Sequence, residues 1–136
     1  METDQIRKAL NKNSIFVGFD EAQLGILIEN ARVRHFAEET TIYEKGEEAS
    51  GTFCLMVAGK ANIISDSGQI LQTCGPNEII GEIGTVSPQH RRTITLTAKT
   101  TVDLVEWDLK AIENELPELF PRLRDLARKR AMHWNY

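Results

Sequence analysis

The feature that most constrains the fold is a strand-like alternation late in the chain. From Thr93 to Ala98, threonine alternates with isoleucine, leucine and alanine. A period of two is typical of a β-strand with one face on a core. Arg92 falls in phase with the apolar residues, so a strand that reaches back to it directs the guanidinium inward. A buried guanidinium needs a partner, and its planar fork fits a phosphate or a carboxylate. The alternative is a loop position in which Arg92 reaches solvent or pairs with an internal glutamate.

A glycine-bracketed turn with one carboxylate lies just upstream of this strand. It reads Gly81-Glu82-Ile83-Gly84. Glycine allows a close backbone approach, and successive N–H groups in such a turn can face the same anion that meets Arg92. Glu82 taken alone is equally consistent with a carboxylate at a helix N-terminus. Turn and strand together indicate an anion-binding loop.

The stretch from Ile79 to Thr100 resembles the phosphate-binding cassette of the cyclic nucleotide-binding domain family. The family pattern is Gly-Glu, a short helix, a variable tip, an arginine followed by a small residue, and a strand ending near Ala-Lys-Thr. Gly81-Glu82, Arg92-Thr93 and Ala98-Lys99-Thr100 hold these places. The Ala-Lys-Thr anchor and the strand phase both select Arg92 over Arg91. With the turn glycines further upstream, the resemblance covers roughly residues 14–126.

The resemblance implies a role for each matching position. Arg92 pairs with the cyclic phosphate, which Thr93 also contacts through its hydroxyl and N–H. The backbone of Ile83 and Gly84 donates to the phosphate oxygens, and Glu82 accepts a hydrogen bond from the ribose 2′-hydroxyl. The Thr93 hydroxyl also suits a guanine base, so cGMP is expected to bind beside cAMP. Further positions are implied for the base: Leu71, Gln72, Trp134 and Asn135.

The rest of the chain predicts a mainly β fold with flanking helices. Short strands are expected at 33–35, 42–43, 53–57, 61–65, 70–74, 78–80, 93–98 and 102–107. Strands this short and this often interrupted by turns favour a double-stranded β-helix, or jelly-roll barrel. Helices are predicted at Asp4–Asn11 and after Asp20, which forms a capping box with Gln23. A C-terminal lid helix begins near Pro117 or near Pro121.

Length and composition limit the classes of protein that fit. The 136 residues predict one domain over 1–136, with the jelly roll at about 31–108 and a helical segment at 109–136. A net charge of -4 argues against a stand-alone nucleic-acid binder, and no helix-turn-helix follows the last helix, so this chain is not expected to bind DNA. The sequence holds no membrane span, and a cytoplasmic location is expected. Cys54 and Cys74 are expected to be reduced residues on strands.

We therefore expect a cyclic-nucleotide sensor without catalytic activity, cofactor or metal, which acts on an effector protein or forms a homodimer through its C-terminal helix. The five basic residues that follow Pro121 form either a solvated helix face or a docking face for an acidic partner. One alternative function is a degenerate family member that acts as a protein-interaction module. Another is a cupin-like metal protein, although His35, His90 and His133 lack ligand spacing.

Overall fold

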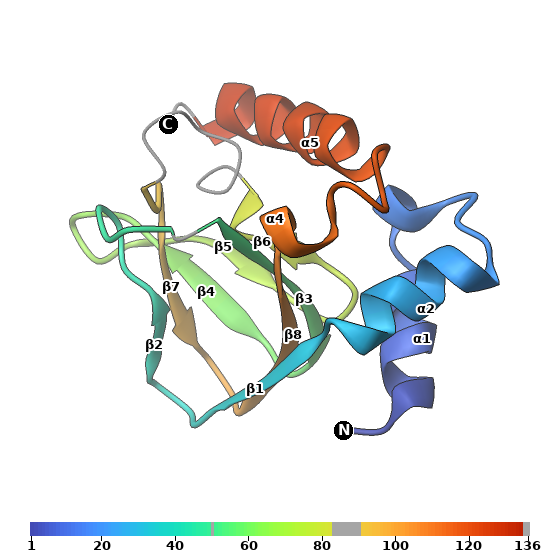
Figure 1. Cartoon of the computed structure of the whole chain (residues 1–136). Helices are drawn as coiled ribbons and strands as arrows, with labels where there is room; N and C mark the ends of the chain where they lie inside the picture. Colours follow the sequence, from blue (N-terminus) through green and yellow to red (C-terminus); the bar gives the residue numbers. More distant parts are fainter. Residues whose placement is uncertain (50, 83–90, 135–136) are drawn as a thin grey trace.

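The computed structural model describes residues 1–49, 51–82 and 91–134, with only the backbone of 131–134. Two antiparallel four-stranded sheets pack face to face, in the orders β1-β8-β3-β6 and β2-β7-β4-β5 (Figure 1). The first sheet consists of β1 (Arg32–Phe36), β8 (Val102–Asp108), β3 (Thr52–Ala58) and β6 (Ile79–Ile80). The second consists of β2 (Thr41–Tyr43), β7 (Thr95–Ala98), β4 (Ala61–Ile64) and β5 (Ile70–Cys74). The mainly β jelly roll is confirmed, as a sandwich of two separate sheets.

Helices flank the sandwich at both ends of the chain, as predicted. They are α1 (Thr3–Asn11), the 3-10 helix η1 (Ser14–Phe16), α2 (Glu21–Glu29), α4 (Leu109–Ile112) and α5 (Leu119–Trp134). The capping box of α2 is confirmed, because the Asp20 side chain accepts from the Gln23 N–H and the Gln23 side chain accepts in return. α5 begins at Leu119, which places Pro121 in its first turn, where a missing N–H costs nothing. No helix in the described part of the chain has the length and hydropathy to cross a membrane.

Two apolar clusters lie on opposite faces of the first sheet. The inner cluster fills the sandwich, and the outer one packs the helices against β3 and β8 (Figure 1). Because both faces of β3 are covered, Phe53 to Met56 are all buried and the strand shows no alternation. Trp107 anchors the outer cluster by stacking on Phe53 and donating to the Leu27 carbonyl at 2.7 Å.

Both cysteines lie on strands, as predicted, and both are buried and free. Burial raises the pKa of the Cys54 and Cys74 thiols to about 12. The thiolate is the nucleophile, so neither cysteine supplies a reactive group at neutral pH.

Two turns depend on a positive φ. Asn77 adopts φ 72°, and its carbonyl accepts from the Asn13 side chain at 2.8 Å, so the asparagine keeps the turn before the cassette. Gly59, between β3 and β4, has φ 91°, and a Cβ built there lies 2.0 Å from the Thr101 carbonyl oxygen. Gly68, in the next hairpin, has a similar φ of 87° but open space around it.

These two glycines provide a matched test of the sandwich. Gly68→Ala is expected to cost about 1 kcal/mol of unfolding free energy, the price of an alanine at positive φ. Gly59→Ala adds the displacement of the Thr101 backbone, which we expect to cost about 1–3 kcal/mol more. Urea unfolding of both variants measures the difference. Equal midpoints would contradict the close approach of the β3–β4 turn to Thr101.

Candidate functional site

Arg92 points into the sandwich, as the strand phase predicts. Burial alternates along this segment, with Arg92, Ile94, Leu96 and Ala98 buried and the threonines between them partly exposed. β7 itself begins only at Thr95, two residues later than the predicted start. Arg92 is instead held in register by the loop between β2 and β3, since its N–H donates to the Glu47 carbonyl and its carbonyl accepts from Gly46, both at 2.8 Å. Arg91, by contrast, is exposed.

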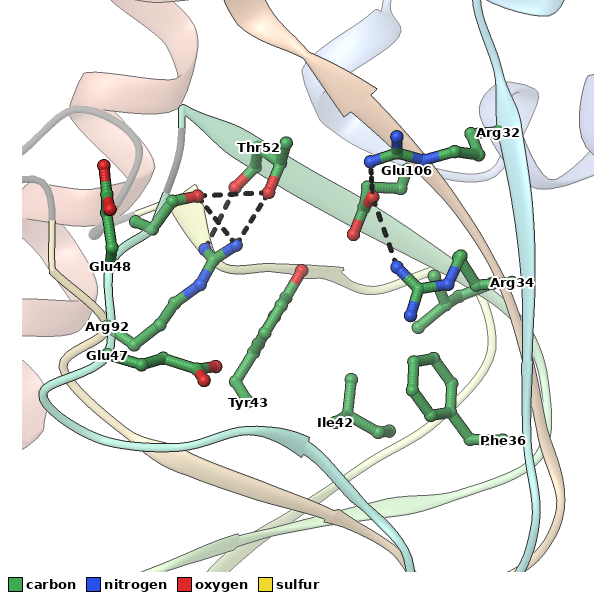
Figure 2. A pocket seen from close by; sticks show the side chains of 12 residues that line it. Arg32, Arg34, Phe36, Ile42, Tyr43, Glu47, Glu48, Thr52, Arg92 and Glu106 are labelled. Atoms are coloured by element: carbon green, nitrogen blue, oxygen red, sulfur yellow. Dashed lines mark hydrogen bonds and ion pairs between the residues drawn. The ribbon is translucent and has the colours of Figure 1, made fainter.

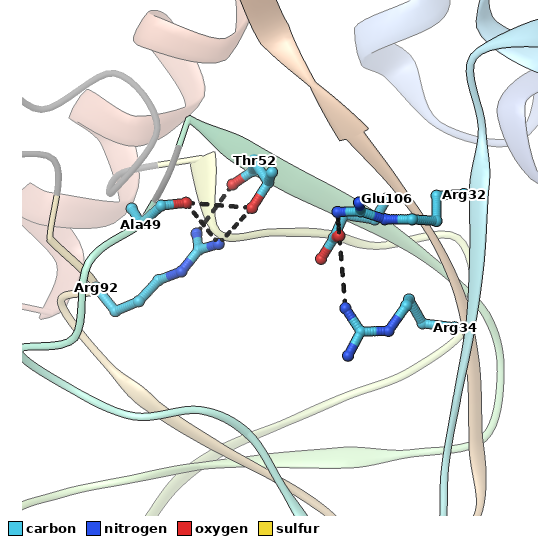
Figure 3. A network of polar contacts seen from close by, with 6 residues as sticks. All are labelled: Arg32, Arg34, Ala49, Thr52, Arg92 and Glu106. Carbon is cyan, nitrogen blue, oxygen red and sulfur yellow. Dashed lines mark hydrogen bonds and ion pairs between the residues drawn. The ribbon is translucent and has the colours of Figure 1, made fainter.

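The guanidinium of Arg92 is surrounded by neutral oxygen acceptors. Nη1 donates to the carbonyls of Thr52 at 3.0 Å and Gly81 at 3.2 Å. Nη2 donates to the Ala49 carbonyl at 3.2 Å and to the Thr52 hydroxyl at 2.8 Å (Figure 3). These four bonds account for the four terminal N–H groups of the side chain. Within the described residues, no carboxylate forms an ion pair with Arg92, so its hydrogen bonds all go to neutral oxygens.

Tyr43 covers one face of this guanidinium. Its ring centroid lies 3.8 Å from Arg92 Cζ, a cation–π contact in a buried setting. Gly81, with φ 88°, lies close to both side chains, because a Cβ there would stand 2.7 Å from Arg92 Nη1 and 3.2 Å from the Tyr43 hydroxyl oxygen. Burial raises the pKa of Tyr43 well above its usual 10.0, so the hydroxyl is neutral. That hydroxyl is buried and makes no hydrogen bond with any described residue.

Glu82, in the glycine turn, is a second buried charge near Arg92, with 2% of its surface exposed. Arg130 of α5 pairs with it, at 2.8 Å between Nη1 and Oε1, and also donates to the Ile79 carbonyl. Burial raises the pKa of Glu82 above its usual 4.5, while the charge of Arg130 opposes that rise. The C-terminal helix is therefore joined to the turn by a largely buried ion pair.

Sequence reasoning missed this role of Arg130 and placed it among the basic residues of the helix surface. Helical spacing carried the signal, because Arg130 continues the buried stripe of Leu119, Leu123 and Ala127 at steps of three and four. Its side chain is only 20% exposed. Arg128, two positions earlier, is 66% exposed and fits the solvated face.

The remaining predicted site residues are distributed over three places. Leu71 and Gln72 lie on β5, the edge strand of the second sheet, where Leu71 is 54% exposed and Gln72 half-buried. Thr93 is half-buried beside Arg92. Trp134 ends α5, but its side chain is not among those described. Ile83, Gly84 and Asn135 lie outside the described residues.

The metal alternative finds no support in the described ranges. No group of three His, Cys, Asp or Glu side chains gathers there as a metal site requires. His35 on β1 pairs with Asp103 at 2.6 Å between Nδ1 and Oδ1, on an exposed face. His90 lies outside the described residues, as does the side chain of His133.

The structure thus combines a two-sheet jelly roll, a buried arginine and a buried glutamate beside a glycine turn, and a helix tied to the glutamate. The model of the cyclic nucleotide-binding domain family matches residues 33–118, which is more than half of the chain. The chain belongs to this family. No curated protein sequence matches it significantly.

Solved structures share the fold. The cAMP-bound PfPKA-R structure aligns with a TM-score of 0.80 at 17% identity, over 98% of this chain and 45% of that one. The regulatory subunit of a cAMP-independent protein kinase A from Trypanosoma brucei gives 0.79 at 16% identity, over 98% and 47%. The N-terminal domain of a transcriptional regulator from Streptomyces coelicolor A3(2) gives 0.71 at 27% identity, over 93% and 92%. The chain thus spans less than half the length of the two kinase regulatory structures.

The stack of Tyr43 on Arg92 makes a prediction about stability. Tyr43→Phe keeps the ring and removes a buried hydroxyl that has no acceptor, so the free energy of unfolding should stay the same or rise. Tyr43→Leu removes the ring face, and we expect a loss of about 2 kcal/mol from the desolvated cation–π contact. Urea denaturation of both variants measures this. Equal losses from the two substitutions would contradict the stacking argument.

Proposed function

We propose that the chain binds a cyclic nucleotide, cAMP first and cGMP measurably, and acts as a sensor without catalysis. The observation that carries this proposal is the buried Arg92 guanidinium, which forms no direct ion pair with a carboxylate among the described residues and interacts with Glu82 only at longer range. A phosphate would supply the direct counter-charge, and it would sit beside the buried carboxylate of Glu82. A cyclic nucleotide carries both complementary groups, an anionic phosphate and a ribose hydroxyl.

In this proposal the residues of the turn, together with Arg92 and Thr93, contact the phosphate and the ribose of the nucleotide. Arg92 would donate its Nε–H to the phosphate. One of its terminal N–H groups would also reach the phosphate if it gave up its bond to the Gly81 carbonyl, which is the acceptor that belongs to the turn. Thr93 adds its hydroxyl and N–H, and the backbone from Gly81 through Ile83 to Gly84 adds further donors. Glu82 accepts from the ribose 2′-hydroxyl.

The output of the sensor would pass through α5. Arg130 on this helix already binds Glu82, so a ribose at Glu82 alters the contact that holds the helix to the turn. Leu71, Gln72, Trp134 and Asn135 then enclose the base. Binding would shift the population of helix positions, and an effector or a second copy of the chain would read that shift. We infer that residues 1–136 form one such regulatory domain.

A degenerate member of the family is the second candidate. Its support is that four protein acceptors already satisfy the terminal N–H groups of Arg92, so the empty site is chemically self-consistent. Among the similar folds, one structure is described as cAMP-bound and another as cAMP-independent. The fold is therefore compatible with both candidates, and nucleotide binding has to be measured.

Calorimetric titration with cAMP and cGMP tests the proposal. Arg92→Ala is expected to weaken cAMP binding by about ten- to a hundredfold, since each charge-assisted hydrogen bond contributes about 1.5–3 kcal/mol. Arg91→Ala is the matched control, because the side chain of this exposed neighbour donates to the Gly46 carbonyl and should change affinity little. Absence of binding to either nucleotide would favour the interaction module. Equal losses from the two variants would contradict the assignment of Arg92.

Deletion of residues 133–136 tests the proposed lid. Trp134 offers an aromatic face for the base, and stacking contributes about 1–3 kcal/mol in single-stranded nucleic-acid binders. The ordering of a chain end offsets part of this, so we expect a loss of about fivefold in cAMP affinity. Trp134→Phe should retain most of the affinity. An unchanged dissociation constant after deletion would mean that the sandwich alone holds the base.

A further inference from the structure

A cavity of about 260 Å³, which Arg92 borders, opens between the edge strands β1 and β2 (Figure 2). The base positions Leu71 and Gln72 lie on β5, at the opposite edge of the sandwich. Of the described residues proposed for the nucleotide, Arg92 alone lines this cavity. The cavity therefore borders the cassette at Arg92 but lies away from the base positions.

At one wall of the cavity, two arginines of β1 face a single glutamate of the neighbouring strand β8. Arg32 and Arg34 both approach the same oxygen, Oε1 of Glu106, which is buried with 6% of its surface exposed. Arg32 forms a hydrogen bond there, whereas Arg34 stays at 3.6 Å. Arg34 makes no hydrogen bond to any described residue. Its planar fork of donors is thus available to a carboxylate in the cavity.

Three apolar side chains lie next to this fork in a lining that is otherwise mostly polar. Phe36, Ile42 and Leu104 line the cavity between the two sheets, and Arg34 Cζ lies 5.1 Å from the centroid of the Phe36 ring. A guanidinium beside an apolar surface complements a ligand that joins an anionic head to a compact apolar body. Figure 2 shows Arg34, Phe36 and Ile42 on the same side of the cavity.

The charges that line the cavity and its volume limit further which ligands can bind there. Glu47 and Glu48 line the loop side and are exposed, so they oppose any multiply charged anion. A multiply charged phosphate monoester is therefore disfavoured, whereas a singly charged anion fits beside Arg34, the β1 arginine that makes no hydrogen bond to Glu106. The volume is at or below the roughly 300–1,000 Å³ of pockets for drug-sized ligands, which selects a small molecule.

We propose that this cavity is a second binding site, specific for a small monocarboxylate with a compact apolar body. The carboxylate receives a bidentate pair of hydrogen bonds from Arg34, and the apolar body packs on Phe36, Ile42 and Leu104. Because the cassette supplies none of these groups, the site binds its ligand without a nucleotide.

Benzoate is the probe, with benzamide as the uncharged control of the same shape. Titration of the ¹⁵N-labelled full chain is followed by the amide resonances of β1, β2 and Leu104. Benzoate is expected to shift them with a dissociation constant of about 1 mM, which is reasonable for so small a ligand. Benzamide should bind at least tenfold more weakly. Equal binding of the two, or shifts scattered outside the cavity, would overturn the proposal.

Arg34→Gln should weaken benzoate binding at least tenfold, and Arg34 is half-exposed on an edge strand, so the variant is expected to fold. Arg128→Gln removes an exposed arginine on α5 and should leave the benzoate dissociation constant unchanged. The same constant in wild type and Arg34→Gln would refute the assigned fork. No nucleotide is present in this experiment, so its failure and the failure of cAMP binding are separate results.

Discussion

The burial of one guanidinium governs the organisation of this domain. Arg92 lies between the two sheets, where an ion without partners is costly, and its terminal N–H groups are met by the carbonyls of Ala49, Thr52 and Gly81 and by one hydroxyl. The loop after β2, the start of β3 and the glycine turn are therefore fastened to a single side chain. Strand β2 contacts the same side chain through Tyr43, whose ring covers one face of the guanidinium.

A second buried charge extends the arrangement to the helices. Glu82 adjoins Gly81 in the chain, and its partner Arg130 comes from α5. The same helix is fixed near its start by Arg122, which donates to the carbonyls of Ile15 and Val17 at 2.7 Å. In the proposed sensing mechanism, a change at Glu82 would act on the N-terminal segment through these two contacts of α5.

The sandwich offers two separate chemical environments because its sheets are not joined at their edges. One edge, with β5 and β6, leads into the glycine turn, and the other, between β1 and β2, contains the cavity with Arg34. Arg92 borders both. Glu106 keeps the second environment from being purely cationic, and the acidic loop side limits it further, so the proposed ligand of the cavity differs from a cyclic nucleotide in size and shape.

Local patterns in the sequence were enough to predict much of this protein. The alternation that ends at Ala98 predicted an inward Arg92 on condition that the strand reached back to it; Arg92 is buried in that phase, although β7 begins only at Thr95. The capping box at Asp20 and the order of strands and helices were also local. The cassette resemblance identified the family, and its assignment of individual ligand contacts remains a prediction.

Tertiary structure alone decided that Arg130 meets Glu82 and that Tyr43 stacks on Arg92. It also decided that β1 and β8 bring Arg34 to Glu106. These pairs lie far apart in the chain, and their contacts depend on how sheets and helices pack, which no local spacing encodes.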